Sequence, residues 1–188
     1  MIREQIIKDL IRDKKVLDVG SMGQTSEYSL WKYYAECAPA SLTGIDIELV
    51  SNESATIFGN DKVIHDVRIL AGNMENYEFH ETFDCIILGD IIEHVGNQAM
   101  LLENCRRYLN QGGKVLITTP NAKWLTVMLR PNRTHVMWHD RYTLARILDI
   151  TGFRIEFLRY YYGNKKHYPF YLRPLVWRQG IICIATPK

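Results

Sequence analysis

Two carboxylates and an amide follow apolar stretches in the first half of the chain, where strands would end. Asp18 and Asp46 lie in or at the end of such stretches, and Asn73 follows a third. A carboxylate offers two acceptor oxygens, so Asp46 is suited to bind both hydroxyls of a ribose. Gly20 would let the backbone turn sharply after the first stretch, and Gly23 would let a ligand approach the main chain. These residue types predict a cradle for a nucleoside-containing cofactor.

Three histidines are candidates for proton transfer. His94 follows a strongly apolar run, whereas His135 and His139 lie in an irregular stretch before a late helix. Histidine titrates near neutral pH and can therefore take a proton from a hydroxyl group. An open alternative is that Glu93 and His94 only fix the conformation of their loop. Asp90, Glu93 and His94 also form a set of oxygen and nitrogen ligands, but adjacent Glu and His side chains diverge on a helix, so we expect no metal.

Aromatic and basic residues gather in two stretches that we expect to cover the site, residues 121–139 and 163–178. Trp138, Arg141 and Tyr142 are the predicted wall for the acceptor. A rim of this composition suits a substrate that carries a ring and a negative group. Two alternatives stay open, which are ordinary packing of late elements and a dimer interface.

Strand-like and helix-like runs alternate along the chain and predict a parallel sheet covered on both faces. Residues 48–66 have no clear pattern, and Gln111-Gly112-Gly113 should separate a helix from the next strand. The predicted helices are 2–13, 27–37, 97–109 and 144–150; the predicted strands are 15–19, 42–47, 67–72, 83–89, 114–119, 153–162 and 180–186.

Composition narrows the class of protein. The 188 residues are 47% hydrophobic and 23% charged, with a net charge of +2, so we expect one domain over residues 1–188 and no nucleic-acid partner. The four cysteines form no CxxC pair, which favours free thiols in a reducing compartment. No leader-like or membrane-length apolar run is visible, so we expect a cytoplasmic protein without a membrane partner.

Six short motifs occur in an order that resembles the class I S-adenosylmethionine-dependent methyltransferases. The similarity is to a small-molecule branch with a Glu-His pair after the fourth strand, which includes ubiquinone-pathway O-methyltransferases and many sugar and natural-product enzymes. The resemblance implies an α/β fold, a Rossmann-like three-layer sandwich with a seven-stranded, mostly parallel sheet whose last strand is antiparallel. The motifs are Val16–Gly20, Gly44–Asp46, Gly72–Asn76, Phe83–Ile87, Ile92–Val95 and Leu109–Lys114 with Thr119–Asn121.

The resemblance also implies roles for residues in binding S-adenosylmethionine. Asp46 would hold the ribose, Asn73 the adenine amino group, and Met74 the adenine ring. One departure from the family pattern stands out, because Met22 and Gln24 occupy positions where glycines are usual. The complete implied cofactor set is Asp18, Gly20, Ser21, Met22, Gly23, Asp46, Ile47, Asn73, Met74, Gly89 and Asp90.

The predicted function is methylation of a small molecule, with oxygen of a sugar, a nucleotide-linked sugar or another hydroxylated metabolite as the acceptor. The alternative is a non-catalytic cofactor-binding or regulatory protein with the same fold. A dinucleotide dehydrogenase would prefer GxGxxG, which Gly20-Ser21-Met22-Gly23 does not complete. The Pro-Pro-aromatic motif of base N-methyltransferases is missing after the fourth strand. We expect a monomer or a homodimer.

Overall fold

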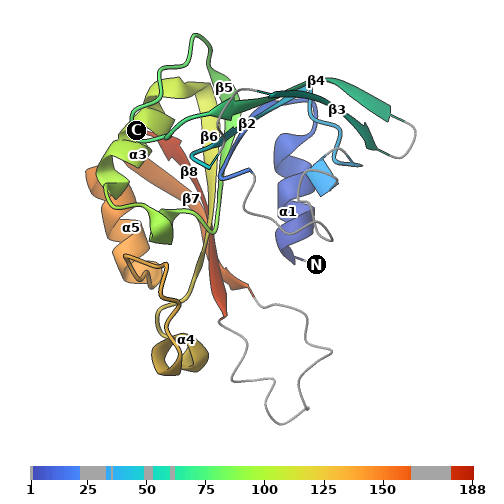
Figure 1. Ribbon diagram of the computed structural model, residues 1–188. Coiled ribbons are helices and arrows are strands. Elements are labelled where there is room, and N and C mark those ends of the chain that lie inside the picture. The colour runs from blue at the N-terminus through green and yellow to red at the C-terminus, as the bar shows by residue number, and fades with distance from the viewer. Residues whose placement is uncertain (1, 22–32, 35, 49–52, 60–61, 162–178) are drawn as a thin grey trace.

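A single eight-stranded β-sheet runs through the middle of the protein (Figure 1). The computed structural model describes residues 2–21, 33–34, 36–48, 53–59, 62–161 and 179–188. The strand order is β3-β4-β2-β1-β5-β6-β8-β7. The strands are β1 Lys15–Val19, β2 Ser41–Asp46, β3 Glu53–Gly59, β4 Lys62–Ala71, β5 Phe83–Gly89, β6 Leu109–Pro120, β7 Phe153–Tyr161 and β8 Gly180–Pro187.

Seven of these strands form the predicted sheet. Strands β4, β2, β1, β5 and β6 are parallel neighbours. The last strand, β8, runs antiparallel to both β6 and β7. The prediction of a mostly parallel Rossmann-like sheet with an antiparallel last strand is therefore confirmed.

One of the eight strands, β3, was not predicted. β3 pairs antiparallel with the first part of β4 and extends the edge of the sheet as a hairpin. A second difference concerns Gly112, which has a φ of +75° and lies inside β6 instead of before it. The pairing of β5 with β6 is irregular there, shifting between Phe83 and Cys85, so the glycines form a distortion at the start of a longer strand.

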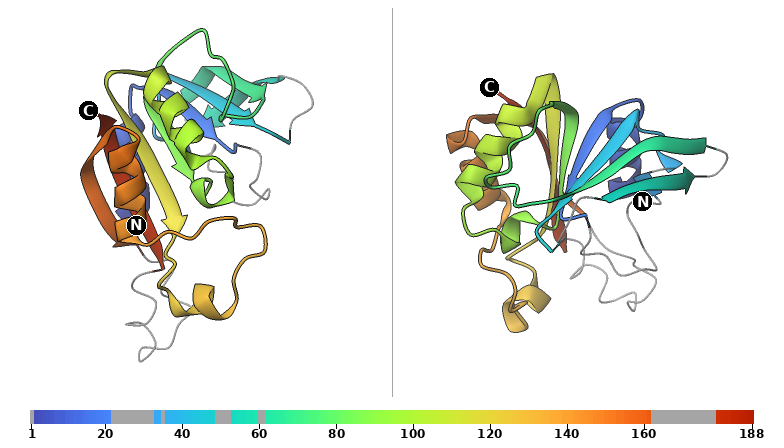
Figure 2. Two further views of the ribbon diagram at one scale, coloured as in Figure 1. Left: turned by 90° about the vertical axis from the view of Figure 1, so that its left-hand side faces the viewer. Right: turned by 45° about the horizontal axis from the view of Figure 1, so that its top comes forward.

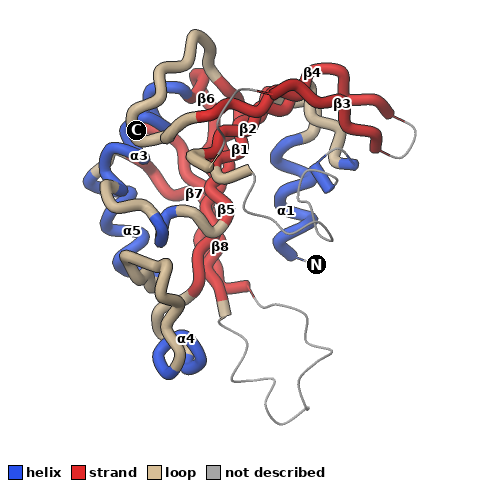
Figure 3. Tube along the Cα trace, in the orientation of Figure 1, coloured by secondary structure: helices blue, strands red, loops and turns tan. Residues whose placement is uncertain are grey.

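Helices cover the two faces of the sheet and make three layers (Figures 1 and 3). Helix α1 (Ile2–Ile11) lies on one face, and α3 (Gln98–Tyr108) and α5 (Arg141–Ile150) lie on the other, as the rotated views confirm (Figure 2). Two shorter helical segments, η1 (Ile92–His94) and α4 (Leu125–Leu129), lie in the connections. Most of the predicted helix 27–37 falls outside the described residues.

Apolar spacing explains which helix faces are buried. Ile7 and Ile11 of α1 pack with Val16 and Leu42 in one core cluster, while Leu101 and Leu144 belong to the cluster on the opposite face. Among the described helices, none is long and apolar enough to cross a membrane.

Helix α5 begins at an N-cap residue, Asp140, which ends the preceding loop. The Asp140 carboxylate accepts hydrogen bonds from the backbone N–H groups of Tyr142 and Thr143, at 2.8 and 2.9 Å, and Thr143 Oγ1 accepts from the Asp140 N–H. This reciprocal capping box fixes the end of the 121–139 connection, and with it the loop that approaches the site.

Candidate active site

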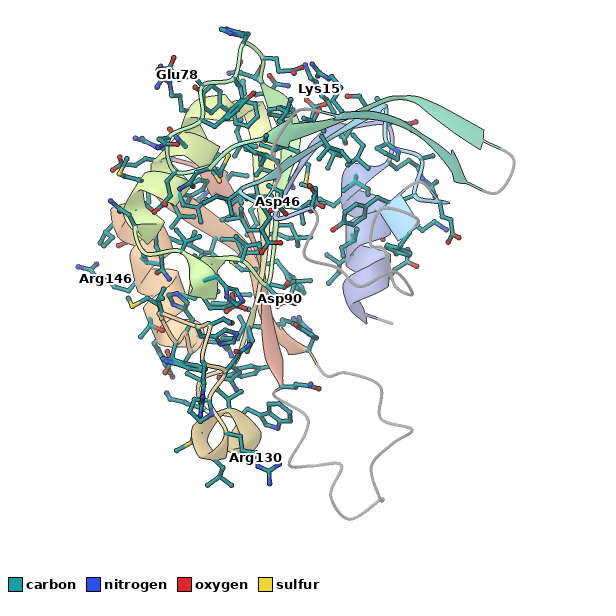
Figure 4. The ribbon with its side chains drawn as sticks, in the orientation of Figure 1. Lys15, Asp46, Glu78, Asp90, Arg130 and Arg146 are labelled. Atoms are coloured by element: carbon teal, nitrogen blue, oxygen red, sulfur yellow. The ribbon has the colours of Figure 1, made fainter. Side chains whose placement is uncertain are left out.

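A cavity of about 690 Å³ lies at the carboxyl ends of the parallel strands. Open α/β sheets bind ligands in this position, where neighbouring connections diverge. Figure 4 shows Asp46 and Asp90, which line the cavity, in the middle of the molecule. Its lining includes Gly20 after β1, Asp46 and Ile47 after β2, Asn73 and Met74 after β4, and Asp90 after β5.

Gly20 gives the cavity its close approach to the main chain. Its φ is +77°, and its N–H donates to the Ile45 carbonyl at 2.8 Å. A Cβ atom on Gly20 would lie 2.1 Å from Ile91 Cδ1 and would also strain this left-handed backbone conformation, so the position favours glycine. Next to it, the Ser21 hydroxyl is buried, and no described residue accepts or donates a hydrogen bond to it. Gly20 lines the cavity, whereas the predicted cofactor residue Ser21 does not.

Asp46 ends β2 with a buried carboxylate at the cavity wall. Its Oδ1 accepts a hydrogen bond from the Glu48 N–H at 2.9 Å, which fixes the direction of the side chain. Glu48 and the exposed Ile47 also line the cavity. The position agrees with the predicted ribose-binding role of Asp46, which stays a prediction.

Asn73 is held by its neighbour Glu75. The Asn73 Oδ1 accepts from the Glu75 N–H, and the Asn73 Nδ2 donates to Glu75 Oε2, both at 2.9 Å. The second carboxylate oxygen of Glu75 accepts from the Asn97 N–H at 2.8 Å. One lone pair of the Asn73 amide oxygen is thus already used, and buried Met74 forms the adjoining apolar wall.

Asp90 lines both the larger cavity, which we name the cofactor cavity after its predicted ligand, and a second, smaller cavity. Its φ is +56°, and its N–H donates to the carbonyl and to Oγ1 of Thr118, at 3.0 and 3.1 Å. The Tyr161 hydroxyl donates to Asp90 Oδ1 at 3.4 Å. Neighbouring strands therefore hold this carboxylate between the two cavities.

The Glu-His segment is hydrogen-bonded to a loop forty residues away. The Glu93 carbonyl accepts from the N–H groups of Val136 and Met137, at 2.9 and 3.2 Å. The His94 Nδ1 lies 3.1 Å from the Thr134 carbonyl. A carbonyl only accepts, so Nδ1 must donate, and Nε2 of the neutral ring carries the lone pair. We call these contacts between 93–94 and 134–137 the loop clamp.

His135 packs its ring against His94, with ring centroids 4.7 Å apart and planes at 89°. Its Nε2 lies 3.2 Å from Asn132 Nδ2, a donor, so the proton of the neutral ring is on Nδ1. Burial, together with nearby His94, lowers the pKa of His135 below its ordinary value. Two of the three predicted histidines thus meet at the junction of the cavities, and Trp138 lies 4.8 Å from His135.

The remaining predicted residues lie elsewhere. His139 is buried behind the loop, Arg141 stacks over Tyr160, and Tyr142 is 77% exposed; none of the three lines either cavity. Asp18 is buried in the middle of the sheet, between Gly44 and Ile87. Four predicted features lie outside the described residues: the cofactor residues Met22 and Gly23, the unusual Gln24, and the cover 163–178.

A possible metal-ligand group differs from the predicted one. Single ligand atoms of Glu93, His94 and His135 lie within 4.8 Å of one another, and Asp90 is not part of the group. Glu93 is buried, whereas His94 is exposed. The expectation that no metal is used stays a prediction.

Sequence reasoning missed several residues that shape the site. Glu75 orders Asn73, Ile91 fills the space beside Gly20, and Thr134 orients His94 through its carbonyl. The acidic Glu75 two residues after Asn73 was a usable signal. The other two act through an apolar contact and a backbone atom, which no residue pattern announces.

Comparisons with known proteins identify the family. Residues 2–157 match the family model described as a methyltransferase domain. The mitochondrial ubiquinone biosynthesis O-methyltransferase of Rattus norvegicus is 28% identical over 115 residues, which cover 61% of this chain and 33% of that protein. The enzyme of the same description from Coxiella burnetii (strain Dugway 5J108-111) is 25% identical over 165 residues, covering 76% and 68%. The chain thus spans about a third of the length of the rat relative.

Solved structures share the fold at low sequence identity. An S-adenosylmethionine-dependent methyltransferase of Mesorhizobium loti superposes with a TM-score of 0.69 at 12% identity, over 98% of this chain and 95% of that one. The 1,6-didemethyltoxoflavin-N1-methyltransferase of Burkholderia thailandensis, solved with its substrate and S-adenosylhomocysteine, gives 0.65 at 13%, over 98% and 78%. Since the family model covers most of the chain, this protein belongs to the methyltransferase-domain family, and it shares the fold of solved S-adenosylmethionine-dependent methyltransferases.

Proposed function

We propose that this enzyme methylates a hydroxyl oxygen of a small metabolite, such as a sugar, a nucleotide-linked sugar or another hydroxylated compound. The observation that carries the proposal is the His94 ring at the junction of the two cavities, with Nε2 as its lone-pair nitrogen. A hydroxyl must lose its proton to become an effective nucleophile, and a correctly oriented neutral imidazole can accept that proton. The ubiquinone-pathway relatives are themselves named as O-methyltransferases.

The residues of the larger cavity fit the cofactor that the family implies. Asp46 would accept hydrogen bonds from the ribose hydroxyls, and Met74 and Leu101 would contact the base. Gly20 leaves room for the ligand at the main chain. When bound, S-adenosylmethionine supplies an electrophilic methyl group on a positively charged sulfur.

Three groups around His94 would prepare this side chain to take a proton from the acceptor. The Thr134 carbonyl fixes the tautomer of His94, so that Nε2 is ready to accept a proton. His135 stays neutral because its pKa is lowered, which avoids a second positive charge beside the new imidazolium. The Asp90 carboxylate lies next to both cavities and would stabilise that imidazolium. General-base catalysis of this kind contributes roughly 10²–10⁴-fold to a rate.

The cofactor assignment is tested by calorimetry with S-adenosylhomocysteine. Asp46→Asn removes one strong charged acceptor and should weaken binding by about 2 kcal/mol, or roughly 30-fold. Glu78→Gln is the matched control, because Glu78 is exposed and lies far from the cavity (Figure 4). Equal affinities for Asp46→Asn and the wild type would remove the ribose assignment.

Methyl transfer is tested separately by following formation of the demethylated cofactor with a panel of hydroxylated sugars and phenols. We expect turnover with at least one oxygen acceptor, and the same rate in the presence of EDTA. A rate abolished by EDTA would assign proton removal to a metal-activated hydroxyl at Glu93, His94 and His135. Cofactor binding without transfer to any acceptor would instead support the non-catalytic alternative.

A further inference from the structure

The second cavity has a volume of about 310 Å³ and touches the cofactor cavity through Asp90. Its other described walls come from the 121–138 connection, from the ends of β6 and β7, and from Gln179 just before β8. Small-molecule sites span ~300–1,000 Å³, so this one is at the lower end of the range. A cavity of this size encloses one ring with a short substituent better than a large conjugate.

The walls of this cavity are suited to a ring. Trp124 and Trp138 both line it, together with Val127 and Pro120. Trp138 is 37% exposed, so part of its indole surface is accessible to a ligand. The negative π face of an indole attracts slightly positive C–H hydrogens, so it packs well against aromatic rings and against the C–H faces of sugars.

The charges at the two ends of the cavity have opposite sign. Asp90 lies at the inner end, beside the cofactor cavity, and Arg130 lies at the outer end, on the segment that follows α4 (Figure 4). Arg130 is exposed and makes no ion pair with any described residue. An anionic group is therefore attracted to the outer end and repelled from the inner end.

From this arrangement we infer that the acceptor is a hydroxylated ring carrying an anionic substituent, bound by Arg130 at a distance from the hydroxyl that is methylated. The two charges orient the molecule, with its anion outward and its hydroxyl inward toward His135 and the cofactor cavity. That this inward hydroxyl is the group that is methylated rests on the proposed function. Arg130 is on this view the residue that determines specificity.

The inference is tested by binding alone, with the protein saturated with S-adenosylhomocysteine. The probes are two matched pairs, caffeate with its neutral methyl ester and glucose 6-phosphate with glucose. A charged hydrogen bond at an exposed arginine should make the anion of one pair bind about tenfold more tightly than its neutral partner. The pair that shows the preference distinguishes an aromatic from a sugar acceptor.

Two arginine variants test whether Arg130 causes the preference for the anionic probe over its neutral partner. Arg130→Gln should reduce the ratio to about one without changing the affinity for the neutral partner. Arg133→Gln is the control, because Arg133 is exposed in the same loop but does not line the cavity, and it should keep the wild-type ratio. Equal affinities within both pairs, no binding of any probe, or loss of the ratio in Arg133→Gln would each overturn the inference. None of these outcomes depends on turnover, so a failed transfer reaction remains a separate result.

Discussion

The His94 side chain is oriented from two directions. The Thr134 carbonyl fixes Nδ1, and the edge-to-face contact with His135 fixes the plane of the ring. In the neutral ring these contacts place the proton on Nδ1 and the lone pair on Nε2, the arrangement that the proposed general base requires.

Substituting His94→Gln should lower kcat about 10²–10⁴-fold, because the glutamine amide keeps some polarity but cannot take up a proton. The affinity for S-adenosylhomocysteine should stay within error of the wild type. Stopped assays of cofactor product between pH 6 and 9, values spanning the histidine range, would also show a steeper rise with pH in the variant. The exposed His80→Gln variant is the control. An unchanged kcat in His94→Gln would exclude His94 as the base.

The stability of helix α5 depends on one side chain at its start, that of Asp140. Asp140 accepts two backbone hydrogen bonds and pairs with Lys123 at 2.5 Å. The Lys123 ammonium beside it and these N–H groups lower the pKa of Asp140 to about 2. The carboxylate thus stays charged throughout the range in which the enzyme would work.

Asp140→Ala should destabilise the protein by about 1 kcal/mol, the usual cost of losing an N-cap acceptor. Urea unfolding followed by circular dichroism measures this change. Lys123→Gln is the control, because it removes the ion pair but keeps the capping box, and its effect should be clearly smaller. If both variants were equally destabilised, the ion pair and not the cap would be the stabilising interaction.

Elements with long apolar runs could be predicted from the sequence, and elements without them could not. The runs at 15–19 and 83–89 coincide with β1 and β5 because strands buried on both faces need continuous apolar residues. The hairpin of β3 and β4 was missed because residues 48–66 carry no clear alternation. At β6, Gly112 was read as a break, but strands tolerate a glycine where their pairing is irregular.

The same difference separates the predicted from the unpredicted parts of the site. Gly20, Asp46 and Asn73 could be proposed because strand-end position and side-chain chemistry are both visible in the sequence. The loop clamp could not, because it joins the Glu93 carbonyl to the backbone of Val136 and Met137. Every residue except proline has such backbone groups, so their pairing depends on tertiary structure alone.

At the scale of the whole molecule, two histidines link stability to pH. Burial lowers the pKa of His139 and of His135, and adjacent Asp140 offsets part of the effect on His139. Each ring is therefore neutral in the folded state over a wider range than in the unfolded chain. The resulting stability is present above the unfolded pKa of ~6.5 and is lost as pH falls through the lower folded value.

The urea concentration at the midpoint of unfolding should accordingly decrease as the pH is lowered from about 7.5 to about 5.5. His139→Leu should reduce this slope, because the variant has no ring to protonate at that buried position. The exposed His80→Gln should keep the wild-type slope. An identical slope in His139→Leu would show that protonation elsewhere controls the pH response.

The loop clamp also has a consequence for the order of events in catalysis. His94 lines the cofactor cavity, and the loop that its segment holds contributes His135 and Trp138 to the second cavity. A ligand that shifts the 93–94 segment in one cavity therefore shifts the wall of the other. Such coupling is reciprocal, since each ligand changes the affinity for the other by the same factor. Loss of one product would then change the affinity for the other, so the loop clamp would link the two release steps.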